Sequence, residues 1–190
     1  MKHTVARMLS IVGHPALLMP ASVVGAALDR GVPRSVLVTA AGASLFIAAV
    51  VGAYSLVKVR AGAWRHMDAS EPRERLQLNR FVIALLGATA LLGWAGGLPR
   101  AIVLGLVLSA LIVAFAHGLR GRLKTSLHAA FAVFAAAVVW PNPVAAAVVL
   151  GLALGVAWSR CVLGRHTVAE AVVGLLAGAL GGVGLHAALG

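Results

Sequence analysis

Residues 35–57 read SVLVTAAGASLFIAAVVGAYSLV, an apolar stretch of 23 residues without a charged side chain. A helix needs about 20 predominantly apolar residues to cross the hydrocarbon core of a bilayer. The stretch therefore predicts a membrane-spanning helix, and the chain repeats the pattern on both sides of it. Charged residues make up only 11% of the whole sequence and hydrophobic residues 61%, which excludes an ordinary soluble domain and a disordered chain.

Six further apolar stretches accompany the first, separated by short polar or proline-containing connections. They cover residues 8–28, 81–98, 101–119, 127–140, 144–158 and 167–190. We expect Pro15 and Pro20 to bend the first of these, because proline lacks the backbone donor of a helix interior. The chain is therefore predicted to be all-α, a single integral membrane domain over residues 1–190. It should form a polytopic transmembrane helical bundle of six or seven spans.

The polar connections should gather on one face of this bundle. Seven spans place residues 58–80, 120–126 and 159–166 on the same face as the N-terminus. Thirteen of the 16 Lys and Arg residues lie there, and the positive-inside rule then favours the cytoplasmic side of the cell (inner) membrane. The net charge of +11 is spread over short gaps, which suits membrane lipids and anionic substrates and argues against nucleic acid as a partner.

Residues 159–170, SRCVLGRHTVAE, carry the most informative polar cluster. His166 and Glu170 are four residues apart at the start of a helix, so their side chains share one face. A carboxylate beside one imidazole nitrogen fixes the tautomer and leaves the other nitrogen as a nucleophile or base. Arg160 precedes them, and its planar guanidinium suits phosphate oxygens. The competing interpretation is an interfacial His and Glu without function, the acid favouring the helix dipole.

Residues 124–128, KTSLH, lie directly before another apolar stretch. Thr125 or Ser126 can cap that helix, whose free backbone N–H groups then point at the polar face. Lys124, a hydroxyl group and a helix N-terminus together make an anion site, and His128 can protonate a leaving oxygen. A helix cap with an interfacial lysine and no function is the alternative.

Residues 58–80 are interpreted as a polar loop rich in basic residues, among them Lys58, Arg73 and Arg75. Its acidic residues would keep the arginines apart and oriented. A solvated loop that only sets the topology would have the same composition. No residue pattern within the loop distinguishes a phosphate-binding loop from a loop that only sets the topology.

Two of these clusters resemble signatures of the type 2 phosphatidic acid phosphatase superfamily. Residues 159–170 are similar to the third signature, S-R-x5-H-x3-D, with a glutamate in place of the aspartate. Residues 126–128 are similar to the second, P-S-G-H, at the expected distance upstream. There Leu127 replaces the glycine, and Thr125 replaces the proline. A lysine before S-x-H and an arginine-rich first loop resemble a divergent bacterial branch of the superfamily.

The first signature, K-x6-R-P, has two candidate registers. Lys58 and Arg65 have the right spacing, but His66 follows them where the family has proline. Asp68 and Arg75 have the same spacing with an acid in place of the lysine. The sequence leaves the register open.

The resemblance implies a helical-bundle phosphatase that uses no metal and no cofactor, with its core formed by the later helices. His166 would attack phosphorus and form a phosphohistidine, Glu170 would orient it, and His128 would protonate the leaving group. The resemblance and the local chemistry imply that phosphate oxygens are held by Lys58, Arg73, Arg75, Lys124, Ser126 and Arg160. The implied substrate is a lipid phosphate: a polyprenyl phosphate or diphosphate, phosphatidylglycerol phosphate or phosphatidic acid.

Two other functions remain open on the sequence. Leu127 and the broken first signature favour a non-enzymatic membrane protein that binds lipid phosphates through a degraded phosphatase site. A zinc enzyme using His128, His166 and Glu170 as ligands is a third interpretation, which the surrounding arginines disfavour.

The remaining notable residues are expected to be structural. Interfacial or packed positions are predicted for His14, His117 and His186. Interface anchors near span ends are predicted for Trp64, Trp94, Trp140 and Trp158. A close-packing face inside the bundle is predicted for Gly174, Gly178 and Gly182. Homo-oligomer formation is left open.

Overall fold

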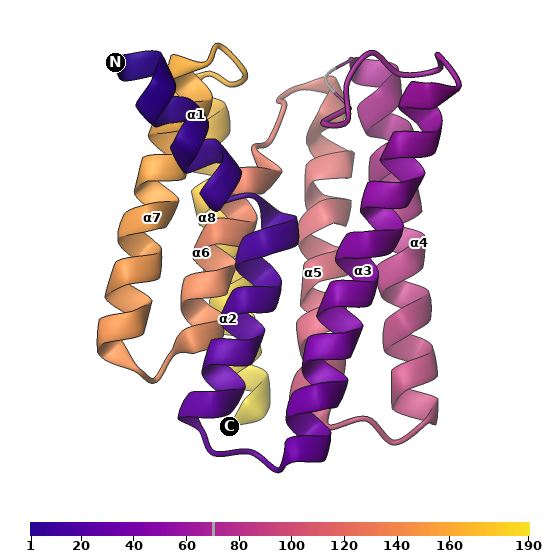
Figure 1. The fold of residues 1–190 in the computed structure, drawn as a ribbon, viewed down its shortest axis with the longest axis vertical. Coiled ribbons are helices and arrows are strands. Elements are labelled where there is room, and N and C mark those ends of the chain that lie inside the picture. The colour runs from indigo at the N-terminus through magenta and orange to yellow at the C-terminus, as the bar shows by residue number, and fades with distance from the viewer. Residues whose placement is uncertain (70) are drawn as a thin grey trace.

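The computed structural model describes residues 1–69 and 71–190, and every regular element in these residues is a helix (Figure 1). The helices are α1 (Lys2–Val12), α2 (Pro15–Asp29), α3 (Arg34–Arg60), α4 (Pro72–Ala95), α5 (Arg100–Gly118), α6 (Leu127–Val139), α7 (Pro143–Val162) and α8 (Val168–Leu189), with a 3-10 turn at Leu119–Gly121. The all-α prediction is confirmed.

Five helices are long and apolar enough to cross a membrane: α3, α4, α5 together with the 3-10 turn, α7 and α8. A sixth span results if α1 and α2 are counted as one helix broken by a bend of 53°. The break lies at Gly13 and His14, and Pro15 opens α2, so the bend predicted at Pro15 is confirmed, whereas Pro20 lies inside α2, which continues past it. The first helix begins at Lys2 rather than at residue 8, because its polar first turn is helical as well.

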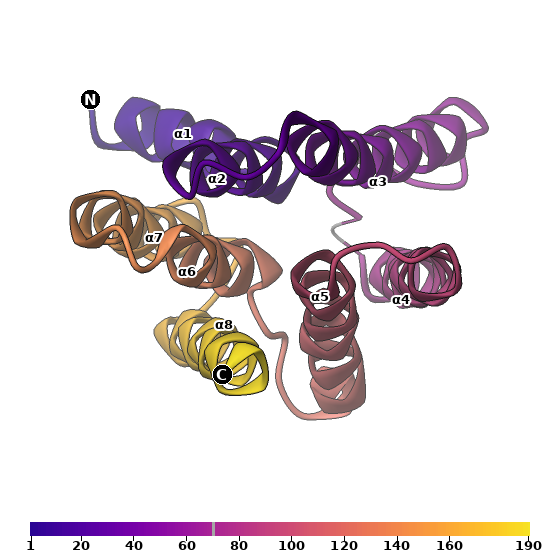
Figure 2. The ribbon, with the colours of Figure 1, turned by 90° about the horizontal axis from the view of Figure 1, so that it is seen from below.

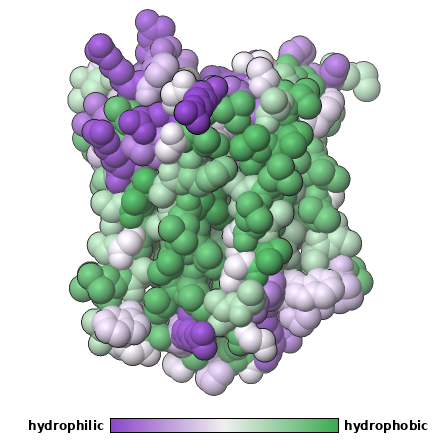
Figure 3. Space-filling view, turned by 180° about the vertical axis from the view of Figure 1, so that it is seen from behind, coloured by the Kyte–Doolittle hydropathy of each residue, from purple (hydrophilic) through white to green (hydrophobic). Residues whose placement is uncertain are grey.

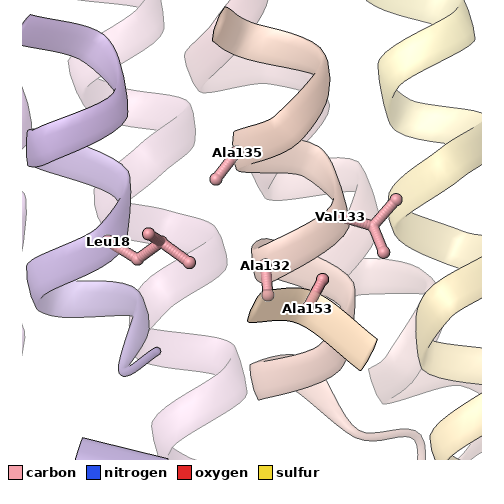
Figure 4. Close-up of a cluster of buried hydrophobic side chains, with 5 residues drawn as sticks. All are labelled: Leu18, Ala132, Val133, Ala135 and Ala153. Carbon is pink, nitrogen blue, oxygen red and sulfur yellow. The ribbon is translucent and has the colours of Figure 1, made fainter. Parts of the chain in front are cut away.

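Helix α6 has only 13 residues and lies in the middle of the bundle. It packs against α2, α7 and α8, and Ala130, Phe134 and Ala135 are completely buried. Figure 4 shows Leu18 of α2 beside a row of α6 side chains. Because α6 is covered by protein, its length need not match the bilayer thickness.

Helix α8 packs against α6 through a row of glycines. A Cβ atom at Gly174 would lie closer than 3.0 Å to the backbone oxygen of Ser126, and one at Gly178 would crowd Ala130 in the same way. A Cβ atom at Gly182 would likewise collide with the side chain of Ala137. The prediction that these glycines form a close-packing face within the bundle is confirmed.

The stretch 58–80 is not a continuous loop. Helix α3 continues to Arg60, and α4 begins at Pro72, so the residues between these helices form a much shorter connection than expected. Helix α4 starts early because its N-terminus is well capped: Glu71 and Glu74 form a capping box around a proline at the first helical position.

One tryptophan is placed differently from the prediction. Trp64 is 4% exposed, and its indole Nε1 donates a hydrogen bond to Oε1 of Gln77 at 3.0 Å. Its ring packs edge-to-face on Tyr54, which stacks on Phe81. Trp64 therefore fastens the connection to the helices α3 and α4 and does not anchor it in the interface. The other three tryptophans are exposed.

The two ends of the bundle differ in polarity. The N-terminus and the connections α3–α4, α5–α6 and α7–α8 lie at one end, whereas the remaining turns and the C-terminus lie at the other (Figure 1). The face seen in Figure 3 has a polar rim at the first end and a broad apolar band below it. Both features are those of a helical membrane protein, and the distribution of basic residues over the two ends follows the sequence prediction.

Candidate active site

His166 lies in the connection between α7 and α8 and is held by its Nδ1 atom. Nδ1 is 3.1 Å from the backbone oxygen of Lys124 and 3.3 Å from Oε2 of Glu170. Both neighbours are hydrogen-bond acceptors, so Nδ1 carries the proton of the neutral ring. The lone pair is then on Nε2, the arrangement that a nucleophilic histidine requires.

Glu170 fastens this geometry to the helix. It is the third residue of α8 and forms a capping box with Thr167. Its Oε2 accepts the backbone N–H of Thr167 at 3.0 Å. Its Oε1 accepts the backbone N–H of Lys124 at 3.3 Å. One carboxylate thus joins the start of α8, the connection before α6 and the ring of His166.

Burial and the nearby positive charges decide the protonation of His166. Burial, followed by the charges of Lys124 and Arg160, lowers the pKa of His166 from 6.5 to about 4, and Glu170 only partly opposes this. The ring is therefore neutral at physiological pH. Burial and the guanidinium group of Arg75 also lower the pKa of Lys124.

Two basic side chains flank His166. Lys124 Nζ donates a hydrogen bond to the backbone oxygen of Arg165 at 2.7 Å, which holds the ammonium group beside the ring. Arg160, on the last turn of α7, is 6% exposed, and its guanidinium donates to the hydroxyl of Ser10 at 2.8 Å. Among the described residues no carboxylate lies at salt-bridge distance from this buried guanidinium, which is therefore suited to an anionic ligand.

Three buried polar atoms near these bases lack a hydrogen-bond partner within the described chain: Arg160 Nε, His128 Nε2 and Thr125 Oγ1. All three residues line the same cavity of about 960 Å³, together with His166 and Lys124. Because buried polar groups are normally hydrogen-bonded, such atoms mark a place for a polar ligand. A phosphate group, with acceptor oxygens on every side, matches these donors.

One residue of the cavity, His14, was not singled out as a site residue by the sequence. The ring of His14 packs edge-to-face on His128, with 4.9 Å between ring centroids, and one potential ligand atom each of His14, Asp68 and His128 lies within 4.8 Å of the others. His14 was expected to be merely interfacial or packed. Only the break between α1 and α2 brings it there, and no sequence spacing reveals that.

The cluster of His14, Asp68 and His128 has the composition of a metal site, but its hydrogen bonding favours an oxygen ligand. Nδ1 of His14 accepts the backbone N–H of Ala16 at 3.2 Å, so the proton of the neutral ring is on Nε2. Metal binding at Nε2 would require the proton to move to Nδ1, toward which the backbone N–H of Ala16 already points. Arg160 also acts electrostatically on both rings, which disfavours a cation.

The basic residues of the first polar stretch divide into two groups. Arg73 and Arg75, in the first turn of α4, line the cavity, as does Asp68. Lys58 lies elsewhere, with its ammonium 5.5 Å from the ring centre of Tyr54. The structure therefore brings one expected register of the first signature, Asp68 and Arg75, to the cavity.

Ser126 is at the site but turned away from the cavity. It is completely buried, its hydroxyl accepts the backbone N–H of Ala129 at 3.4 Å, and its own N–H donates to the backbone oxygen of Glu170. Ser126 is the cap of α6, one of the two caps that the sequence allowed. The adjacent Thr125 presents the free hydroxyl group instead.

No family model, no curated protein and no solved structure matches the chain.

Proposed function

We propose that the protein is a membrane lipid phosphatase, of the type 2 phosphatidic acid phosphatase kind, that works without a metal through a phosphohistidine at His166. One observation carries the proposal. The Nδ1 atom of His166 lies between two acceptors, which puts the lone pair on Nε2, in a cavity lined by Lys124, Arg75 and Arg160. The phosphomonoester or diphosphate of a lipid is the substrate class.

The proposed reaction has two displacements. In the first, His128 takes up the proton of the monoanionic phosphate as the substrate binds, Nε2 of His166 attacks phosphorus, and the bond to the leaving oxygen breaks. His128 then gives its proton to that leaving oxygen. In the second, neutral His128 takes a proton from water, whose oxygen attacks phosphorus and breaks the bond to His166. Lys124, Arg75 and Arg160 stabilise the phosphoryl oxygens in both transition states. A bound phosphate would itself favour the protonated form of His128.

The proposed location follows from the charge distribution. The end of the bundle that holds the candidate site also holds most of the basic residues, so the positive-inside rule favours the cytoplasmic side of the cell membrane. There the phosphate of a lipid reaches the basic residues while its chains remain in the bilayer.

The experiment is phosphate release from a panel of lipid phosphates in detergent, with EDTA present. The panel contains a polyprenyl phosphate and diphosphate, phosphatidylglycerol phosphate and phosphatidic acid. We expect release by the wild type and none by His166→Ala, while His3→Ala, at an exposed histidine of α1, retains full activity. Labelled substrate should leave acid-labile, base-stable phosphate on the wild type and on His3→Ala but not on His166→Ala.

One observation favours a second candidate function, a lipid-phosphate-binding protein without activity. The Ser126 hydroxyl, expected to bind phosphate, is occupied by the cap of α6 and faces away from the cavity. If no lipid phosphate is hydrolysed but a phosphonate analogue binds and Arg160→Ala abolishes binding, the binding protein replaces the enzyme. Activity that EDTA abolishes would contradict both candidates.

A further inference from the structure

The cavity that holds the candidate site continues deep into the bundle as an apolar slot. Helix α3 lines it with one face from Ser55 to Val36, and α5 lines it from Ala116 to Ala101. Figure 2 shows the row of α2 and α3 opposite α4 and α5, with α6 to one side. The slot ends at Trp140 on the far side of the molecule.

The slot is open because small side chains line it and no helix fills it. A Cβ atom at Gly52 of α3 or at Gly105 of α5 would meet no other atom within 4 Å. The outer face of α3 carries large residues instead, with Leu45 and Phe46 more than half exposed. Helix α3 packs along α2 and touches α4 at only a few points, which leaves the space between them free.

The length of the slot exceeds one leaflet. Val36 and Ser55 are 19 residues apart on one helix, and a rise of 1.5 Å per residue makes this face about 28 Å long. The hydrocarbon core of a bilayer is about 30 Å thick, so each acyl chain of an ordinary phospholipid occupies about half of it. Such chains would leave the far half of the slot empty.

Hydrogen bonds hold Arg30 in place at the far end of the slot. The guanidinium group of Arg30 donates to the backbone oxygen of Val138 at 3.0 Å and to that of Trp140. At the opposite end the slot opens directly on Lys124 and Arg75. Most of the basic side chains that line the cavity gather at this end, which favours a lipid bound with its phosphate there and its chain pointing toward Arg30.

From this geometry we infer that the slot holds the chain of a single-chain lipid phosphate long enough to pass the bilayer midplane, such as a polyprenyl phosphate. The inference rests on the proposed function for the chemistry but on the slot alone for the chain. Gly105 lies in the far half of the slot and Gly52 in the half next to the candidate site. The open space beside these two glycines determines how long a lipid chain the slot can hold.

The test uses three glycines at which a leucine enters open space, so that each variant can fold: Gly105→Leu, Gly52→Leu and, as the control, Gly42→Leu on the exposed face of α3. Hydrolysis is compared for a long polyprenyl phosphate and for farnesyl phosphate, which is too short to reach Gly105. Binding of a long polyprenyl phosphonate is measured in parallel.

We expect Gly105→Leu to lower kcat/KM for the long substrate about tenfold and to leave farnesyl phosphate unchanged. The effect is modest because the displaced chain returns to lipid or detergent and loses only packing contacts. Gly52→Leu should impair both substrates and Gly42→Leu neither. An equal effect of Gly105→Leu on both substrates, or none on either, overturns the inference.

If the proposed phosphatase activity is absent, the same variants give a different pattern of results from the one expected when only the inference about the slot is wrong. If the wild type hydrolyses nothing, phosphonate binding still reports on the slot: weaker binding by Gly105→Leu and not by Gly42→Leu retains the inference without the enzyme. If wild-type activity is high on phosphatidic acid and Gly105→Leu leaves all substrates and the phosphonate unaffected, the phosphatase stands and the slot does not hold the chain.

Discussion

The contact between α6 and α8 and the slot between α3 and α5 use the same kinds of small residue for opposite purposes. Between α6 and α8, Gly174 and Gly178 bring two backbones so close that even a methyl group has no room. Between α3 and α5, Gly52 and Gly105 face open space. Small residues in a membrane helix therefore do not by themselves indicate a helix contact. Whether a second helix approaches them decides if these residues form a close helix contact or line an open slot.

The candidate site lies where these two regions meet. The sealed region, where α6 and α8 are in contact, supplies His166, Glu170 and His128. The geometry of these side chains must be fixed to within a fraction of an ångström for the proposed catalysis. The open region supplies Asp68, Arg75 and the slot, which have to admit a large ligand. The division matches the general need for a rigid reacting group beside an accessible binding surface.

The largest difference between the two regions should appear in protein stability when one glycine in each region is replaced by alanine. Gly178→Ala is expected to destabilise the protein by about 3 kcal/mol or to prevent folding, because its Cβ atom collides with the backbone of Ala130. Gly52→Ala should be neutral or stabilising by up to about 1 kcal/mol, because alanine favours the helix. Unfolding in mixed detergent and SDS micelles measures both. Equal effects would contradict the comparison.

The next effect compares two glutamates with the same structural task. Glu170 and Glu74 each close a capping box and accept a backbone N–H from a preceding connection, Lys124 and Arg65 respectively. Replacing either by alanine should cost about 1–2 kcal/mol. Only Glu170→Ala should also reduce kcat, by about 100-fold, since it frees the His166 ring. A similar loss of kcat in Glu74→Ala would show that both act through folding alone.

The smallest effect is the titration of the His166 ring in acid. The lowered pKa of His166 predicts that its ring resonance, identified by its loss in His166→Ala, titrates near pH 4 rather than 6.5. The unfolded chain binds this proton more readily, so between these pH values stability falls as the pH falls. A midpoint near 6.5 in side-chain NMR would mean that the ring is solvated and not held as described. Activity should remain high down to about pH 5 for the same reason.

Much of this arrangement was predictable from sequence because it is local. Uninterrupted apolar stretches predicted the helices, and spacing of four residues placed Glu170 beside His166. The topology then put residues 124–128 next to residues 159–170. Each of these inferences needs only the helix period and the direction of the chain.

The features that escaped prediction depend on tertiary placement. His14 reaches His128 only through the bend between α1 and α2, and Trp64 is buried only because the connection folds back on α4. Lys58 and Arg75 were equivalent as bases of one polar stretch. They separate because one ends α3 and the other begins α4. The slot is a property of helices that fail to touch, and no residue pattern encodes it.

The carboxylate of Glu170 has a consequence for biosynthesis. The backbone N–H of Lys124, the start of α8 and the ring of His166 are all bound to this one group. Helix α8 leaves the ribosome after α1 to α7, so until it inserts and docks, the ring lacks the carboxylate that helps to fix its tautomer and orientation. A chain inserted only as far as α7 has most of the helices that line the slot but lacks the carboxylate that orients the proposed nucleophile. Maturation of the bundle and the onset of its chemistry are thus a single event.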